Sequence, residues 1–107
     1  MQIVITALCK KGNSLREAIA GDDRLDAFRL QVVKQLQPGR SPGWLKIHST
    51  ERQRGAIKLQ WDGQAQVLTA RVVTRGSKAP SSIVGDFINY LLARHGRRVV
   101  AITTAQR

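Results

Sequence analysis

The strongest constraint on the fold lies between residues 55 and 75, where two alternating runs flank Asp62-Gly63. The apolar set is Ile57, Leu59, Trp61, Leu68, Ala70 and Val72, and the polar set is Lys58, Gln60, Thr69, Arg71 and Arg75. Alternation with a period of two is typical of a strand with one dry face. Asp-Gly between two such runs indicates a hairpin turn. We therefore predict a β-hairpin with one apolar face that needs a cover.

The length of the hairpin loop decides which side chains share a face. A loop of two or four residues puts the leucines of both strands on one face, whereas three residues would bury the arginine-bearing face, because a one-residue slip inverts a strand. We favour four residues, 62–65, which places Leu59 opposite Leu68. Gly63 is then expected at a positive φ, where a Cβ would clash.

Local signals predict the elements before the hairpin. Residues 3–8 are rich in β-branched side chains and indicate a strand. Ser14 and Glu17 fit a capping box that starts a short helix, and Gly21 is placed to end it. Apolar residues at helical spacing predict a longer helix over 22–36, and the Pro- and Gly-rich run 38–43 ends it. Alternation predicts a strand over 44–49.

The elements after the hairpin are a helix and a strand. Ser81 or Ser82 can cap a helix over 81–95 that carries a broad apolar face, and Gly96 suits its end. Residues 99–104 indicate a last strand. We therefore predict a single compact two-layer α+β domain over residues 1–107. A central antiparallel three-stranded meander (about 44–49, 55–61 and 67–75) has helices (about 22–36 and 81–95) on one face, and further strands lie near both termini.

The predicted order over residues 22–95, helix, three strands, helix, resembles that of the double-stranded RNA-binding domain. The resemblance is one of topology. It implies that basic residues at the start of the second helix meet phosphates, and Lys78 is the matching position here. The paired lysines of that family are absent, since Ala79, Pro80, Ser81 and Ser82 follow Lys78.

The net charge of +11 is the unusual feature of the composition. It is unevenly distributed: residues 1–36 hold 6 basic and 4 acidic side chains, whereas residues 37–107 hold 12 and 3. A positive field of this size favours polyanions or acidic surfaces as partners. No apolar run approaches the roughly 20 residues of a membrane span, so we expect no membrane partner and a cytoplasmic protein.

The sequence offers little for catalysis or for a cofactor. One cysteine, Cys9, and two histidines, His48 and His95, lie on different predicted elements, so neither a metal site nor a nucleophile with its base is indicated. Two junctions before helices, 10–14 and 76–78, could bind phosphate, although a plain turn is the simpler interpretation of each. We predict a non-enzymatic protein without metal or cofactor.

The outward face of the predicted sheet is the candidate site. It would carry basic residues interleaved with an aromatic, a combination that can neutralise phosphates and stack a base. The candidate nucleic-acid-binding residues are Trp44, Lys46, His48, Lys58, Arg71, Arg75 and Lys78. The alternative is a protein-interaction or assembly subunit, self-associating or part of a complex, that pairs through a sheet edge or through a patch at Val67 and Val73. Polyanion binding would weaken steeply with salt, and edge pairing much less.

Overall fold

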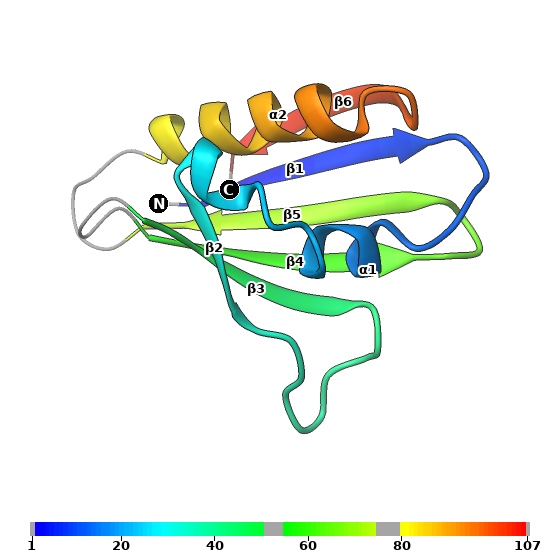
Figure 1. Cartoon of the computed structure of the whole chain (residues 1–107), viewed down its shortest axis with the longest axis horizontal. Coiled ribbons are helices and arrows are strands. Elements are labelled where there is room, and N and C mark those ends of the chain that lie inside the picture. Colours follow the sequence, from blue (N-terminus) through cyan, green and yellow to red (C-terminus); the bar gives the residue numbers. More distant parts are fainter. Residues whose placement is uncertain (1, 51–54, 75–79, 107) are drawn as a thin grey trace.

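Six strands and three helices make up the part of the chain that the structure describes, residues 2–50, 55–74 and 80–106 of a computed structural model (Figure 1). In chain order they are β1 (Gln2–Cys9), α1 (Leu15–Ala20), the 3-10 helix η1 (Leu25–Phe28), β2 (Leu30–Lys34), β3 (Trp44–Ser49), β4 (Ala56–Asp62), β5 (Val67–Val73), α2 (Ser81–His95) and β6 (Val99–Gln106). All strand pairs are antiparallel, in the order β2-β3-β4-β5-β1-β6. The predicted α+β class is confirmed.

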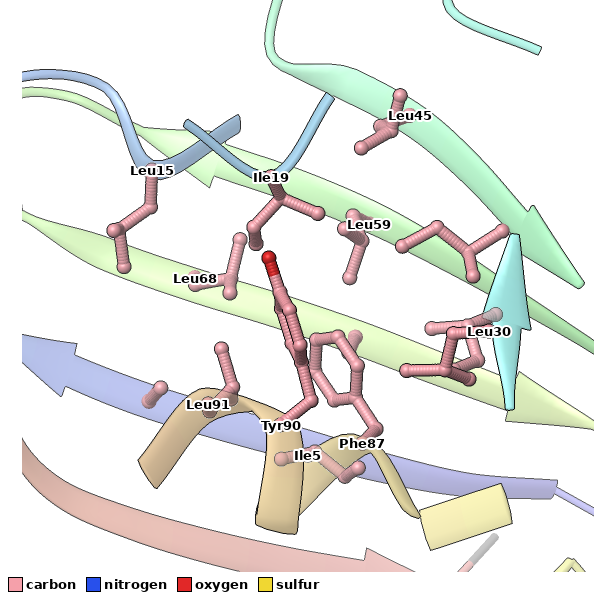
Figure 2. Packing of buried hydrophobic residues seen from close by; sticks show 14 of the residues in the cluster. Ile5, Leu15, Ile19, Leu30, Leu45, Leu59, Leu68, Phe87, Tyr90 and Leu91 are labelled. Atoms are coloured by element: carbon pink, nitrogen blue, oxygen red, sulfur yellow. The ribbon is translucent and has the colours of Figure 1, made fainter. Parts of the chain in front are cut away.

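The helices lie on one face of the sheet (Figure 1). Beneath them, the inward side chains of five strands meet those of α1 and α2, and Figure 2 shows Phe87 and Tyr90 of α2 lying over the strands. Phe87 and Tyr90 are fully buried, as are Leu45, Leu59 and Leu68 from the strands. Because only one face of the sheet contributes to this core, the alternate side chains of the same strands project from the other face.

The two faces of the hairpin are as predicted, but its register is not. All six residues of the predicted apolar set are buried. The loop has four residues, as preferred, yet it spans 63–66, since Asp62 pairs with Val67. Leu59 therefore faces Ala70, and Trp61 faces Leu68, instead of the predicted pair Leu59–Leu68. Because the pairing is shifted by one residue in each strand, the same side chains remain on each face of the hairpin, and the prediction of the two faces holds although the register was wrong.

The expected positive φ at Gly63 is wrong. The left-handed residue of this loop is Gln66, with φ 57°, and Gly63 is not among the glycines of positive φ. The Asp62 carboxylate accepts hydrogen bonds from the backbone N–H groups of Gln64 (3.0 Å) and Ala65 (3.1 Å), an Asx-type turn that fixes the start of the loop. The hydrogen bonds of the Asp62 side chain therefore stabilise the turn that the sequence analysis attributed to a positive φ at Gly63.

The helix predicted over 22–36 does not form. Only residues 25–28 are helical, and Arg29 then adopts a left-handed conformation with φ 63° that ends the turn. Residues 30–34 form β2, in which Leu30 pairs with Ser49 and Val32 with Ile47. The β-branched pair Val32-Val33 favours an extended chain, and the backbone hydrogen bonds along β3 outweigh a helical spacing that was coincidental.

The other helices keep their predicted bounds closely. In α1, the Ser14 hydroxyl accepts from the Glu17 N–H at 3.3 Å, and Gly21 follows as the C-cap. In α2, the bounds match the prediction, but Pro80 precedes the helix and no side chain caps it, so the predicted serine cap is wrong. Among the described residues, no helix is long and apolar enough to cross a membrane.

Strands β3, β4 and β5 lie side by side in sequence order, and β2 extends this meander by one strand. The strands near the termini, β1 and β6, continue the sheet beyond β5. With a strand where the first helix was expected, the order no longer matches helix, three strands, helix. The topological resemblance to the double-stranded RNA-binding domain is therefore lost.

A change to alanine should destabilise the protein at Gly55 but not at Gly63. Gly55 has φ +130°, and an added Cβ would collide with the carbonyl oxygen of Val73, whereas at Gly63 it would meet only Trp61 Nε1 at an ordinary 3.5 Å. Gly55→Ala is expected to lower the free energy of unfolding by about 1–3 kcal/mol, and Gly63→Ala to change it by less than about 0.5 kcal/mol. Urea unfolding of both variants measures this. A larger loss at Gly63 would contradict the loop conformation described above.

Candidate functional site

Four basic residues form a row across the face of the sheet opposite the helices. Lys34 pairs with Lys46, Lys46 with Lys58, and Lys58 with Arg71, so the row crosses four adjacent strands from β2 to β5. Neighbouring strands lie about 4.8 Å apart, which gives the row a span of about 14 Å. We call Lys34, Lys46, Lys58 and Arg71 the cationic row. It continues on β1 and β6 with Val4 and Ala105, which are uncharged.

The residues on either side of the cationic row fix its direction. Leu45 and Ile47 flank Lys46, and Ile57 and Leu59 flank Lys58; all four are fully buried in the core under the helices. Successive side chains of a strand point to opposite faces, so the lysines between them project away from the helices. The core thus sets the position of each cation on β3 and β4.

Among the described residues, few carboxylates lie near the cationic row. Within the described residues the acids of the N-terminal half are Glu17, Asp22, Asp23 and Asp26, in and between α1 and η1, and Asp86 is on α2. Asp62 lies at the hairpin turn, where its carboxylate is bonded to the loop. None of the ion pairs found among the described residues involves a member of the row. Like charges directly opposite each other destabilise a sheet, so the row carries an electrostatic cost within the fold.

A second row, uncharged and polar, runs beside the cationic one. Gln60 pairs with Thr69, Thr69 with Thr6, and Thr6 with Thr103, which carries the row from β4 to β6. The two rows are two residues apart along each strand, about 7 Å. Hydroxyl and amide groups donate hydrogen bonds to phosphate and sugar oxygens, as lysine and arginine do. The face therefore offers cations on one half and neutral donors on the other.

Trp44 does not offer its ring to a ligand. Its backbone pairs with Gln60, which puts it on the face of the two rows, but its side chain is only 4% exposed and lies outside the main core cluster. The preceding loop reaches this end of the sheet, where Ser41 Oγ is bonded to Gln60 Nε2. From the other side, the buried Arg16 of α1 donates to the Trp44 carbonyl oxygen at 3.1 Å. Its burial removes the stacking role expected of Trp44 in this conformation.

The structure thus brings together three of the seven predicted residues as a row, Lys46, Lys58 and Arg71. His48 is on the same face at the end of β3, half-buried and opposite Gln31 and Ala56. Arg75 and Lys78 lie outside the described residues. Sequence reasoning missed Lys34 because it assigned 22–36 to a helix. The signal that could have found it is the β-branched pair before it.

The first of the two predicted phosphate junctions is already occupied by a side chain. The Arg98 guanidinium donates to the carbonyl oxygens of Lys10 (3.1 Å) and Asn13 (2.9 Å), and to Gln66 Oε1 (3.3 Å). An added Cβ at Gly12 would touch the same guanidinium. Arg98 therefore clamps the loop after β1 to the hairpin loop, and a plain turn with an internal cation is the correct interpretation of 10–14. The second junction, 76–78, lies outside the described residues.

The densest polar cluster joins α2 to the loop before η1. Tyr90 donates its hydroxyl proton to Asp22 Oδ2 at 2.8 Å, and its oxygen accepts from His95 Nε2 at 2.9 Å. Arg94 completes the cluster with two hydrogen bonds of 3.2 Å to the Asp22 carboxylate. Since a carboxylate only accepts, the donor roles of Tyr90 and His95 follow. Every member is satisfied by another, which makes this a structural tie.

Burial and hydrogen bonding shift the pKa values of this cluster. Burial alone would raise the pKa of Asp22, but the hydrogen bonds from Arg94, the Arg24 N–H and Tyr90 outweigh it, and the pKa lies below its ordinary value. Burial and the Asp22 charge raise the pKa of Tyr90, so the hydroxyl stays protonated. Burial, with help from Arg94 and Arg98, holds the pKa of His95 below its ordinary value. Burial also raises the pKa of the Cys9 thiol, which disfavours its nucleophilic thiolate form.

No group of three or more potential metal ligands is found among residues 2–50, 55–74 and 80–106. No protein-family model, no curated protein and no solved structure matches the chain. The function is therefore inferred from geometry and charge, of which the cationic row is the most distinctive feature.

Removing the charge of Lys58 should stabilise the fold. Lys58 lies between Lys46 and Arg71, so Lys58→Gln relieves two like-charge pairs and is expected to raise the free energy of unfolding by about 0.2–1 kcal/mol at low salt. The gain should shrink in high salt, which screens the repulsion. Urea unfolding at two salt concentrations measures both effects. The control, Arg24→Gln on the helix side, should show no gain, and a loss of stability in Lys58→Gln would contradict the repulsion.

Acid should destabilise the protein in two steps. The folded-state pKa of His95 is below the value of about 6.5 in the unfolded chain, so the unfolded state binds more protons as the pH falls. The contribution of neutral His95 to the free energy of unfolding is therefore complete above about pH 6.5 and is lost as the pH falls through the folded-state pKa. Asp22 acts in the same direction, and its contribution is lost below about pH 4. Unfolding by urea across this range measures the profile. In His95→Gln the first step should disappear while the second remains; an unchanged first step would exclude His95 as its source.

Proposed function

We propose that this protein is a small non-enzymatic module that binds nucleic acid through the phosphate backbone. The observation that carries the proposal is the cationic row, which places four positive side chains on one face without an ion-pair partner among the described residues. Such a row costs stability unless something outside the chain compensates it. A polyanion supplies that compensation, and the net charge of +11 favours its approach.

The chemistry of the face suits recognition of the backbone rather than of the bases. Phosphates spaced along a strand can be met by the cationic row, and sugar and phosphate oxygens by the neighbouring row of Gln60, Thr69, Thr6 and Thr103. The aromatic residue predicted for base stacking, Trp44, is buried. We therefore propose binding with little dependence on sequence, with His48 at the end of β3 as a candidate contact and with Arg75 and Lys78, which follow β5 in the sequence, as further candidates.

No metal or cofactor enters this proposal, and its compartment is the cytoplasm, where a single cysteine stays reduced. The second candidate function is a protein-interaction or assembly subunit. Val67 and Val73 are both half-buried residues of β5 that share the open face, and an apolar partner could cover them.

Salt dependence of binding tests the proposal. A protein that neutralises four phosphates should show a slope of log affinity against log salt of about −3.6 on duplex DNA and about −2.8 on single strands. Each cation removed should reduce the magnitude of the slope by about 0.9 and about 0.7 respectively. We expect Lys58→Gln and Arg71→Gln to weaken binding to single- and double-stranded oligonucleotides of any sequence, with this reduction in slope. Fluorescence anisotropy over a salt series measures both quantities.

Arg24→Gln is the matched control, because it removes the same charge from an exposed position on the helix side. Its affinity and slope should stay closer to those of the wild type. Equal losses in all three variants would indicate diffuse attraction to a positively charged protein and exclude the cationic row as a site. Absence of binding at physiological salt would reject the nucleic-acid function and favour the interaction subunit.

A further inference from the structure

Strand β6 is a long edge with an open side. It is the last strand in the order β2-β3-β4-β5-β1-β6, and all of its eight residues except Val100 pair with β1. From Ala101 to Gln106 the pairing with β1 is regular, after a bulge at the start of the strand. The outer side of an edge strand presents a row of backbone N–H and C=O groups that can pair with another chain.

Beyond the bulge at its start, β6 lacks the usual protection of an edge strand. Its sequence, VVAITTAQ, contains no charged residue and no proline. Val100 is 63% exposed, and Leu92, on the helix α2 that packs against β6, is 55% exposed. Natural sheets place charges, prolines or short strands at their edges to prevent pairing between molecules. An edge of this length without those features is suited to pairing.

The opposite edge of the same sheet does carry such protection. β2 has five residues, a bulge between Val32 and Lys34, and a lysine at its end. Pro38 follows after a short stretch. In a β2–β2 pair the lysines would also add to the repulsion between two basic molecules. The difference between the two edges singles out β6.

We propose that two copies of this chain pair through β6, antiparallel and related by a twofold axis, so that the sheet continues from one copy into the other. A twofold interface uses the same surface on both copies, and an uncharged strand meets itself without like-charge pairs. Arg97 and Arg98 precede β6, and in the antiparallel pair the two arginine clusters lie at opposite ends, about 27 Å apart for eight residues. The partner is a second copy and not an acidic segment, because β6 offers no cation along its length.

Sedimentation of the full chain without nucleic acid tests the pairing. The wild type is expected to show twice the mass of the chain as the concentration rises. The dimer should hold or strengthen when salt is raised from about 50 mM to about 500 mM, because salt screens the repulsion between two copies of charge +11. This dependence is opposite to that of nucleic-acid binding, so failure of one proposal is distinguishable from failure of the other.

Charges introduced on β6 should abolish the pairing, and opposite charges should restore it. Ala101→Lys with Thr103→Lys adds two cations to the edge and should weaken the dimer by about tenfold or more. The matched control is Gln31→Lys with Val33→Lys, which adds the same charge at the β2 edge and should leave the dimer largely intact. Mixing the β6 lysine variant with Ala101→Glu/Thr103→Glu should restore association, which also shows that both variants fold. A monomer at every concentration, or a dimer indifferent to the β6 changes, would overturn the proposal.

Discussion

Burial of one face of the sheet under the helices is the constraint on which the rest of the structure depends. The alternation on β4 and β5 places Ile57, Leu59 and Val72 on that face, and the residues that alternate with them in each strand are then on the other. The positions of Lys58 and Arg71 are therefore a consequence of core packing. A charge on this face cannot be moved to the helix side by slipping the register, because the slip would expose the leucines.

The sequence predicted well those parts of the fold that local chemistry decides. The α2 bounds follow from helical spacing, α1 from Ser14 and Glu17, and the faces of the hairpin from parity, all of which need no knowledge of distant residues. The error at 22–36 has a different origin. The run containing Val32 fits either period, and only its pairing with Ile47 on β3 decides between them. Because Lys34 belongs to this run, the same error left Lys34 out of the predicted site.

Two internal ties use polar side chains to hold distant segments of the chain together, and one of them occupies a junction that the sequence left open as a phosphate site. Arg98 fills the junction after β1 with its own guanidinium, and Asp22, Tyr90, Arg94 and His95 satisfy one another between α2 and the loop before η1. In both places polar groups that could serve a ligand instead hold distant segments together. The cationic row differs in this respect, since none of the ion pairs found among the described residues involves its side chains. Sequence alone cannot separate these cases, because the partners of Arg98 and Asp22 lie far away along the chain.

The place of β1 in the sheet has a consequence for the order of folding. Ile5 pairs with Ala70 on one side and with Thr104 on the other, so both neighbours of the first strand are made long after it. Within the unit β2 to β5, in contrast, the pairs are β2–β3, β3–β4 and β4–β5, all between strands that are consecutive in the sequence. Closing short loops costs less entropy than closing long ones, so the four-strand unit can assemble early, while β1 can join the sheet only by closing the long connection to β5. During synthesis β1 is thus left without its first sheet neighbour until β5 has been made, and without its second until β6 has been made.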